Sequence, residues 1–204
     1  MFARGSLAWI STPLVLAMVM TSVSLWTHSM IAYVVSAILF MTAASMAVFF
    51  RDPERVVGDG IVSPADGRVA FLDEDEGTLS IVMGLRHVHV TRSPYAGKVV
   101  DSTRVRGSHE PAFRDISRTN ERIEMIISSK VGDFAVTLIT GIVARRILPY
   151  VKAGDKLRKG QRIGIIRFGS RVNLSLPRCC RITVPLNHSV RAGESQIAEV
   201  IDES

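Results

Sequence analysis

Three polar side chains of the sequence have the types needed for an activated nucleophile. Asp66 lies in the predicted turn 64–67, His89 lies in a run of alternating residues, and Ser170 follows Gly169 between two apolar stretches. A carboxylate that orients an imidazole, and an imidazole that takes a hydroxyl proton, are the parts of such a nucleophile. The sequence alone does not bring them together. Taken singly, each is more often a structural residue.

A second imidazole lies close to the first. Alternation over residues 85–94 predicts a strand that carries His87, His89 and Thr91 on one face. Both histidines are therefore candidates for the general acid or base. Cys179 and Cys180 are adjacent, which rarely suits a disulfide between them, and they have no histidine at zinc spacing. No metal site is predicted.

The elements that must position these residues are predicted to be short strands. After residue 50 the helical periodicity fades, and apolar runs alternate with turn residues, which is typical of an all-β domain. The predicted strands are 61–63, 68–72, 79–83, 85–94, 98–100, 123–127 and 133–142, with 143–147 extending the last. The polar, arginine-rich residues 104–122 are predicted to form a long loop that covers a site.

Two segments near the end of the chain resemble each other. Residues 151–164 and 188–198 both place a basic residue and a glycine before a strand. Such turns are typical of biotinyl and lipoyl carrier domains, in which two hairpins form a flattened β-sandwich or barrel. The modifiable lysine of those carriers is missing, so the similarity concerns the fold alone.

The first 50 residues have a different composition. Residues 7–26 and 30–50 are apolar, and each has the length of about 20 residues that a helix needs to cross a bilayer. A transmembrane helical hairpin is therefore predicted over residues 1–50, before a soluble domain at 51–204. Arg4 before the hairpin and Arg51 and Arg55 after it place both ends in the cytoplasm.

The net charge of +6 fits an anionic membrane surface or a nucleic acid. Aromatic and basic residues do not interleave as a nucleic-acid stacking platform requires. The apolar N-terminal segment favours the membrane surface as the partner. No nucleic-acid partner is predicted.

Six ordered motifs resemble the short form of the phosphatidylserine decarboxylase proenzymes, a family that includes archaetidylserine decarboxylases. They are FRDP at 50–53, SPADG at 63–67, VHVTRSP at 88–94, NER at 120–122, GIVARRI at 141–147 and RFGSRV at 167–172. The resemblance covers nearly the whole chain. Asn173 stands where the short form commonly has aspartate, and His87 stands where many members have aspartate and other branches use a second histidine.

The resemblance implies that the chain cuts itself between Gly169 and Ser170. It would leave a large β chain, residues 1–169, bound as a heterodimer to a small α chain, residues 170–204, with a higher oligomer left open. Ser170 would become a covalent pyruvoyl cofactor. Asp66 and His89 match the family's aspartate and histidine, and His87 is a second candidate for the acid or base.

The implied reaction converts an anionic, phosphatidylserine-type lipid of the cell membrane to the phosphatidylethanolamine type, with release of CO2, on the cytoplasmic face. Arg51, Arg55, Arg86 and Arg92 are the candidates for binding the lipid phosphate. Two other functions stay open. One is a membrane-anchored serine hydrolase that uses the same three residues, and the other is a non-catalytic carrier-like membrane module, against which the missing lysine counts.

Overall fold

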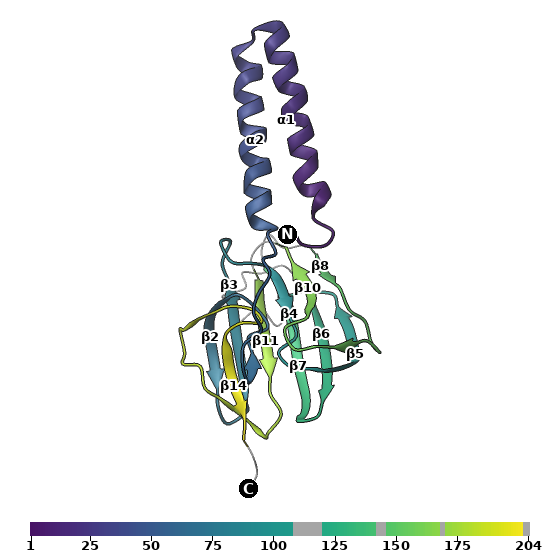
Figure 1. Ribbon diagram of the computed structural model, residues 1–204, viewed down its shortest axis with the longest axis vertical. Coiled ribbons are helices and arrows are strands. Elements are labelled where there is room, and N and C mark those ends of the chain that lie inside the picture. The colour runs from purple at the N-terminus through teal and green to yellow at the C-terminus, as the bar shows by residue number, and fades with distance from the viewer. Residues whose placement is uncertain (108–119, 142–145, 168–169, 202–204) are drawn as a thin grey trace. The chain divides into compact units, whose positions relative to one another are not determined.

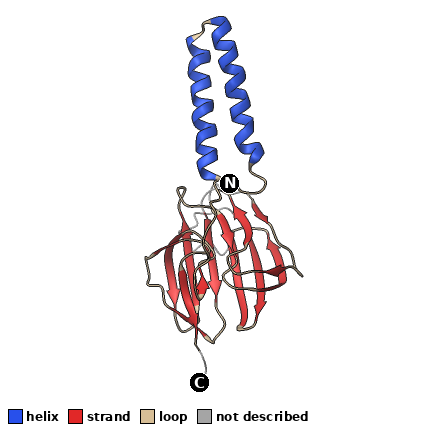
Figure 2. Cartoon of the chain, in the orientation of Figure 1, coloured by secondary structure: helices blue, strands red, loops and turns tan. Residues whose placement is uncertain are grey.

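The computed structural model describes residues 1–107, 120–141, 146–167 and 170–201. The chain forms two compact units, Met1–Glu54 and Arg55–Ser204. The first contains two helices and the second is built from strands (Figures 1 and 2). The prediction of a mainly β domain preceded by an apolar helical hairpin is confirmed.

Helix α1 (Leu7–Thr27) and helix α2 (Met30–Phe49) pack through small residues. Ala17, Ala32 and Ser36 are buried, whereas most large apolar side chains of both helices face outward. The hydroxyl groups of Thr21 and Ser36 lie 2.6 Å apart, and Ser36 also donates to the carbonyl of Ala17 at 3.2 Å. Small side chains and bonded hydroxyls are what membrane helices use to approach each other.

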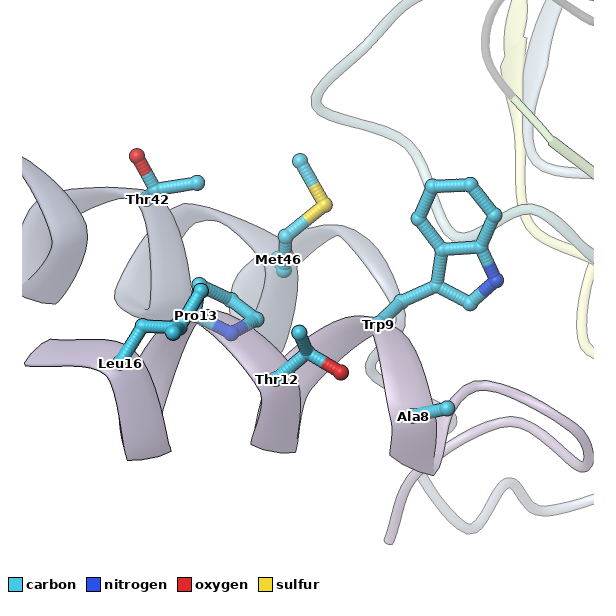
Figure 3. A pocket seen from close by; sticks show the side chains of 7 residues that line it. All are labelled: Ala8, Trp9, Thr12, Pro13, Leu16, Thr42 and Met46. Carbon is cyan, nitrogen blue, oxygen red and sulfur yellow. The ribbon is translucent and has the colours of Figure 1, made fainter.

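Both helices are long and apolar enough to cross a membrane. A cavity of about 490 Å³ lies between them, and Pro13 is part of its wall (Figure 3). Because proline has no N–H, it cannot donate to the carbonyl of Trp9. The lining residues are Ala8, Trp9, Thr12, Pro13, Leu16, Thr42 and Met46.

The described part of the second unit contains fourteen strands. In chain order they are β1 (Ile61–Val62), β2 (Gly67–Asp73), β3 (Thr78–Met83), β4 (Val90–Arg92), β5 (Gly97–Val105), β6 (Arg122–Ser129), β7 (Gly132–Thr140), β8 (Ile147–Pro149), β9 (Lys156–Leu157), β10 (Arg162–Ile166), β11 (Ser170–Ser175), β12 (Cys180–Ile182), β13 (Ser189–Val190) and β14 (Gln196–Val200). Inward residues of these strands, such as Ile81, Phe134 and Val172, form one apolar core.

The strands pair in a pattern that contains an internal duplication. The largest sheet has the order β13-β2-β3-β11-β7-β6-β5-β9, and the two smaller sheets are β1-β14-β12 and β4-β10-β8. When β2 is exchanged with β5, β3 with β6, β11 with β7 and β13 with β9, the large sheet has the same strand order, read from its other edge. Exchanging β1 with β4, β14 with β10 and β12 with β8 turns one small sheet into the other. The unit therefore consists of two copies of one strand arrangement.

Individual hydrogen bonds repeat in the two copies. The hydroxyl of Ser63 donates to the carbonyl of Ala65 at 2.7 Å, and that of Ser93 donates to Tyr95 at the same distance. Gly193 donates its N–H to the carbonyl of Ser63 at 2.8 Å. In the other copy, Gly160 donates to Ser93 at 2.9 Å, and both glycines have positive φ, at 77° and 74°. The similarity of residues 151–164 and 188–198 therefore reflects equivalent turns in the two copies.

One copy is inserted into the other. Strands β4 to β10 form the second copy without interruption, whereas the first consists of β1 to β3 and β11 to β14. Strands β6 and β7 are joined by a short turn between Ser129 and Gly132. The equivalent pair, Met83 and Ser170, is separated in the sequence by the entire second copy. Ser170 is thus the first residue of β11, whereas its counterpart Gly132, the first residue of β7, follows a hairpin turn.

Several predicted strand boundaries were wrong. Strand β4 covers only Val90–Arg92, and the residues from Val88 to Arg92 are all buried, so the predicted two-faced alternation over 85–94 is absent. Part of the predicted loop 104–122 belongs to β5 and β6, and its middle, 108–119, lies outside the described residues.

Ile147 does not extend the preceding strand. It begins β8, which pairs with β10 in a different sheet, while 142–145 are not described. The other predicted strands are confirmed to within a few residues.

Candidate active site

The backbone of Ser170 lies between two neighbouring strands. It pairs with Met83 at the end of β3 and with Thr140 at the end of β7. Gly169, the other residue of the predicted cleavage pair, lies outside the described residues. Ser170 is the first residue of a strand in the interior of the eight-stranded sheet, so its backbone is held from both sides.

A backbone hydrogen bond connects His89 to β10, the strand that precedes Ser170 in the sequence. The N–H of Ile166, the last residue of β10, donates to the carbonyl of His89 at 3.2 Å. Met83, six residues before His89 in the sequence, pairs in turn with Ser170. Ile166 comes four residues before Ser170 in the sequence, so these pairings connect the segment of His89 with the strand that Ser170 begins.

The imidazole of His89 is buried, with 1% of the residue exposed. Its Nδ1 lies 2.9 Å from the carbonyl oxygen of His87. Because a carbonyl only accepts hydrogen bonds, Nδ1 carries the proton in this arrangement. In the neutral ring, Nε2 then holds the lone pair that can take a proton.

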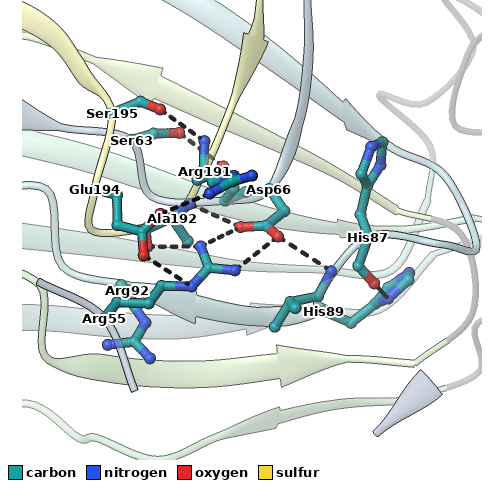
Figure 4. Close-up of polar contacts among 12 residues, drawn as sticks. Arg55, Ser63, Asp66, His87, His89, Arg92, Arg191, Ala192, Glu194 and Ser195 are labelled. Carbon is teal, nitrogen blue, oxygen red and sulfur yellow. Dashed lines mark hydrogen bonds and ion pairs between the residues drawn. The ribbon is translucent and has the colours of Figure 1, made fainter. Parts of the chain in front are cut away.

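His87 has a different environment. It is half-buried, and its ring Nδ1 accepts a hydrogen bond from the backbone N–H of Gly84 at 2.8 Å. The backbone N–H of His87 donates to the carbonyl of Gly84 at 3.0 Å. The ring therefore closes the turn that follows β3. Its carbonyl holds the imidazole of His89 (Figure 4).

Asp66 is the centre of a buried network. Its carboxylate accepts hydrogen bonds from both terminal nitrogens of Arg55, at 2.5 and 2.9 Å. It also accepts from the N–H of Ala192 at 2.8 Å and from the N–H of Val88 at 3.3 Å (Figure 4). Asp66 thus holds the backbone next to His89, whereas the sequence suggested that it orients the imidazole itself.

The four arginines proposed for phosphate binding also differ in their surroundings. The side chain of Arg55 is 6% exposed, and that of Arg92 is buried and donates to the carbonyl of Gly160 at 3.2 Å. Both guanidinium groups are buried against other parts of the β unit, so they are poorly placed for a lipid headgroup. Arg51 donates to the carbonyl of Val48 at 2.8 Å, and Arg86 lies exposed in the turn before His87.

Comparisons with known proteins agree with the sequence motifs. The family model described as phosphatidylserine decarboxylase matches residues 42–198. The chain belongs to this family. A protein of Methanosarcina mazei named as an archaetidylserine decarboxylase proenzyme is 40% identical over 98% of this chain and 97% of its own length.

Two further relatives carry the two names used within the phosphatidylserine decarboxylase family. An Archaeoglobus fulgidus protein named as an archaetidylserine decarboxylase proenzyme is 45% identical over 79% of this chain and 81% of its own. A phosphatidylserine decarboxylase proenzyme of Streptomyces griseus is 42% identical over 76% of this chain and 74% of its own.

For this family member, sequence reasoning missed two buried polar residues beside Ser170. Thr140 pairs with Ser170 in the sheet, and its hydroxyl donates to the carbonyl of Glu121 at 3.0 Å. The side-chain amide of Asn120 donates to the carbonyl of Thr140 at 2.8 Å, and both residues are fully buried. The NER motif was the available signal, but its position after a long polar stretch concealed the burial.

Among the described residues, no group of histidine, cysteine, aspartate and glutamate side chains is arranged to hold a metal ion. Cys179 and Cys180 are free thiols whose sulfur atoms lie 3.9 Å apart, and Cys179 donates to the carbonyl of Val131 at 2.8 Å. Burial, with smaller contributions from Cys179, raises the pKa of the Cys180 thiol to about 12.

The raised pKa predicts that Cys180 resists alkylation in the folded protein. At pH 8 a thiol with this pKa has on the order of 10⁻⁴ of its molecules as the reactive thiolate. In a Cys179→Ser variant treated with iodoacetamide at pH 8, we expect Cys180 to react at least about 10²-fold more slowly before unfolding than after it, because unfolding returns the pKa to about 8.5. Equal rates in the two states would contradict the burial argument.

Proposed function

We propose that this chain is a self-processing decarboxylase. It cuts itself between Gly169 and Ser170, forms a pyruvoyl group from Ser170, and converts a phosphatidylserine-type lipid to the phosphatidylethanolamine type with release of CO2. Membership of the phosphatidylserine decarboxylase family supports the reaction class. The backbone pairing that connects the segments of His89 and Ser170, through Ile166 and Met83, is the structural observation that supports the proposal.

In the first step, Nε2 of His89 takes the proton of the Ser170 hydroxyl, and the oxygen attacks the carbonyl carbon of Gly169. The peptide C–N bond breaks and an ester forms, with the proton passing to the new amine. Removal of the Ser170 α-proton then expels the β chain as a carboxylate. Water hydrolyses the resulting enamine and releases ammonia. Gly169 suits the attack because it has no side chain to block it.

The residues around Ser170 fit a pyruvoyl group at this position. Strand β11 pairs with β3 and β7 along its whole length, so the chain that begins at residue 170 would stay in the sheet after the cut. When present, the group supplies the electron sink that loss of CO2 from an amino acid requires. His89 then holds the proton that returns to the substrate carbon. The buried surroundings of His89 limit the access of water to that proton transfer.

The cleaved chains are proposed to stay together. The small α chain would contain β11, which lies between β3 and β7, and β14, which lies between β1 and β12. It would also contain β13 at the edge of the large sheet. Because these strands pair with the β chain in two sheets, the mature protein would be a stable heterodimer.

The membrane hairpin is proposed to keep this domain on the cytoplasmic face. Substrate and product both remain in the bilayer, so an anchored site meets the headgroup without extracting the lipid. Arg4 and Arg51 at the two ends of the hairpin favour the cytoplasmic orientation. Exposed basic residues such as Arg86 would attract the anionic leaflet.

The proposal is tested on the full chain, expressed in membranes and purified in detergent. Intact-mass analysis under denaturing conditions should find two chains, the smaller beginning with a pyruvoyl group at residue 170, and native mass analysis should find them together. Vesicles with ester-linked or ether-linked serine lipid should each be tested for CO2 release. Hydroxylamine, which attacks the ketone, should abolish the activity.

Other results would identify the alternatives. A single full-length chain with decarboxylase activity would rule out the pyruvoyl mechanism. Labelling of Ser170 by a fluorophosphonate, without cleavage, would favour a serine hydrolase. A chain that shows neither cleavage nor either reactivity would favour the carrier-like module.

A further inference from the structure

Arg55 forms a buried ion pair with Asp66 in the β unit. Its two terminal nitrogens contact the two carboxylate oxygens of Asp66 separately, and one of them also donates to the carbonyl of Ala192 at 2.9 Å. Glu194 lies 4.0 Å from its Nε. Both partners of the pair have less than a tenth of the side chain exposed. Such paired contacts fix direction as well as distance.

The pair connects three parts of the chain that must stay in register. Asp66 holds the N–H of Val88, the residue next to His89, and the N–H of Ala192. Ala192 belongs to the proposed α chain, whereas Arg55, Asp66 and Val88 belong to the proposed β chain. Arg55 itself follows the membrane hairpin closely in the sequence. The contacts therefore span both products of the proposed cleavage.

We propose that Arg55 is a positioning residue for self-cleavage, acting through Asp66 on the segment that carries His89. This inference rests on the proposed function. Without the guanidinium group, the Asp66 carboxylate loses two of its four hydrogen bonds and a buried countercharge. It then turns toward water or toward a different partner, and the Val88 N–H loses its fixed acceptor. The Nε2 of His89 is then no longer held for the proton transfer proposed above.

The geometry also explains why arginine is needed in place of lysine. A guanidinium group reaches both carboxylate oxygens and the Ala192 carbonyl from one plane. A lysine ammonium keeps the charge but binds as a point and cannot reproduce this fork. Arg55→Lys therefore separates the effect of charge from the effect of direction.

The experiment follows cleavage as it happens. Full-length chains are made by cell-free translation into nanodiscs of anionic lipid, and the appearance of the small chain is timed on denaturing gels. Arg55→Gln is expected to slow cleavage by about 10²-fold, the loss typical of a misplaced reacting group. Arg55→Lys should fall between it and the unmodified chain. Arg191→Gln is the matched control, because Arg191 pairs with Glu194 in the same cluster at 3.6 Å but its side chain is 75% exposed. It should cleave within about twofold of the unmodified rate.

A second set of variants separates positioning from folding. The same substitutions are made together with Ser170→Ala, and the stability of these uncut chains is compared by limited proteolysis. An Arg55→Ala chain is also supplied with free guanidinium at millimolar concentration, which should restore part of the cleavage rate if the group acts by holding Asp66. Should Arg55→Gln not fold, the comparison passes to Arg55→Lys.

The outcomes distinguish this inference from the proposed function. If the unmodified chain is never cut, the proposed function fails. If the unmodified chain is cut and folded Arg55→Gln or Arg55→Lys is cut at the same rate, the positioning role of Arg55 is wrong and self-processing stands. Slow cleavage in a folded variant, with rescue by guanidinium, supports the inference.

Discussion

Ser170→Ala is expected to leave one uncut chain with no decarboxylase activity. Alanine has no hydroxyl to attack the Gly169 carbonyl, and it cannot become a ketone. The effect should therefore be complete loss of both cleavage and CO2 release. Intact-mass analysis and an assay with serine lipid vesicles measure the two. The backbone pairing of residue 170 with Met83 and Thr140 does not involve the side chain, so the variant should fold normally.

Ser175→Ala is the matched control for this substitution. Ser175 is the last residue of the same strand and pairs with Thr78 and Ala135. The Ser175→Ala substitution removes an identical hydroxyl group from the opposite end of β11, so cleavage and activity should remain. Two chains from Ser170→Ala, with a break at the same bond, would show that a different group is the nucleophile.

His89→Gln is expected to slow self-cleavage by about 10² to 10⁴-fold, the usual contribution of a general base. Glutamine keeps a donor for the His87 carbonyl but has no nitrogen that takes a proton at neutral pH. The loss therefore reports proton transfer more directly than a truncation to alanine. The measurement is the rate at which the small chain appears after translation. Cleavage at the unmodified rate would exclude His89 from the first step.

His87→Gln provides the comparison within the same turn. Its ring accepts one hydrogen bond from Gly84, so its loss should cost about 1 kcal/mol of stability and reduce cleavage only modestly. If His87→Gln stopped cleavage while His89→Gln did not, the assignments of the two histidines would be reversed. The small amount of mature enzyme formed by each variant, assayed per pyruvoyl-bearing chain, tests whether the same histidine also serves in decarboxylation.

The site shows where prediction from sequence succeeded and where it could not. The helical hairpin followed from long apolar segments, and most strands followed from short apolar runs between turn residues, because both are local patterns. The strand predicted over 85–94 failed because Val88 and His89 are held by Asp66, His87 and Ile166, which override the alternation. These contacts link residues that local periodicity cannot connect.

Arg55 illustrates the same limit. As one of several arginines after an apolar segment, it was interpreted as a membrane-facing charge and as a candidate for the lipid phosphate. Its burial against Asp66 depends on the turn that contains Ala192, more than a hundred residues later in the chain. No local sequence pattern around Arg55 predicts a contact with the turn that contains Ala192.

The sequence alone determined the β class of the domain, the apolar hairpin, the family and the residue types of the site. These depend on composition, short periodicity and ordered motifs, which are properties of neighbouring residues. Tertiary structure decided that one copy of a duplicated strand arrangement is inserted into the other, and that Ser170 pairs with Met83 while His89 is bonded to Ile166. It also decided that Asp66 bonds to the backbone N–H of Val88, next to His89, and not to the imidazole. Strand pairing between distant segments fixes these relations, because each depends on both partners at once.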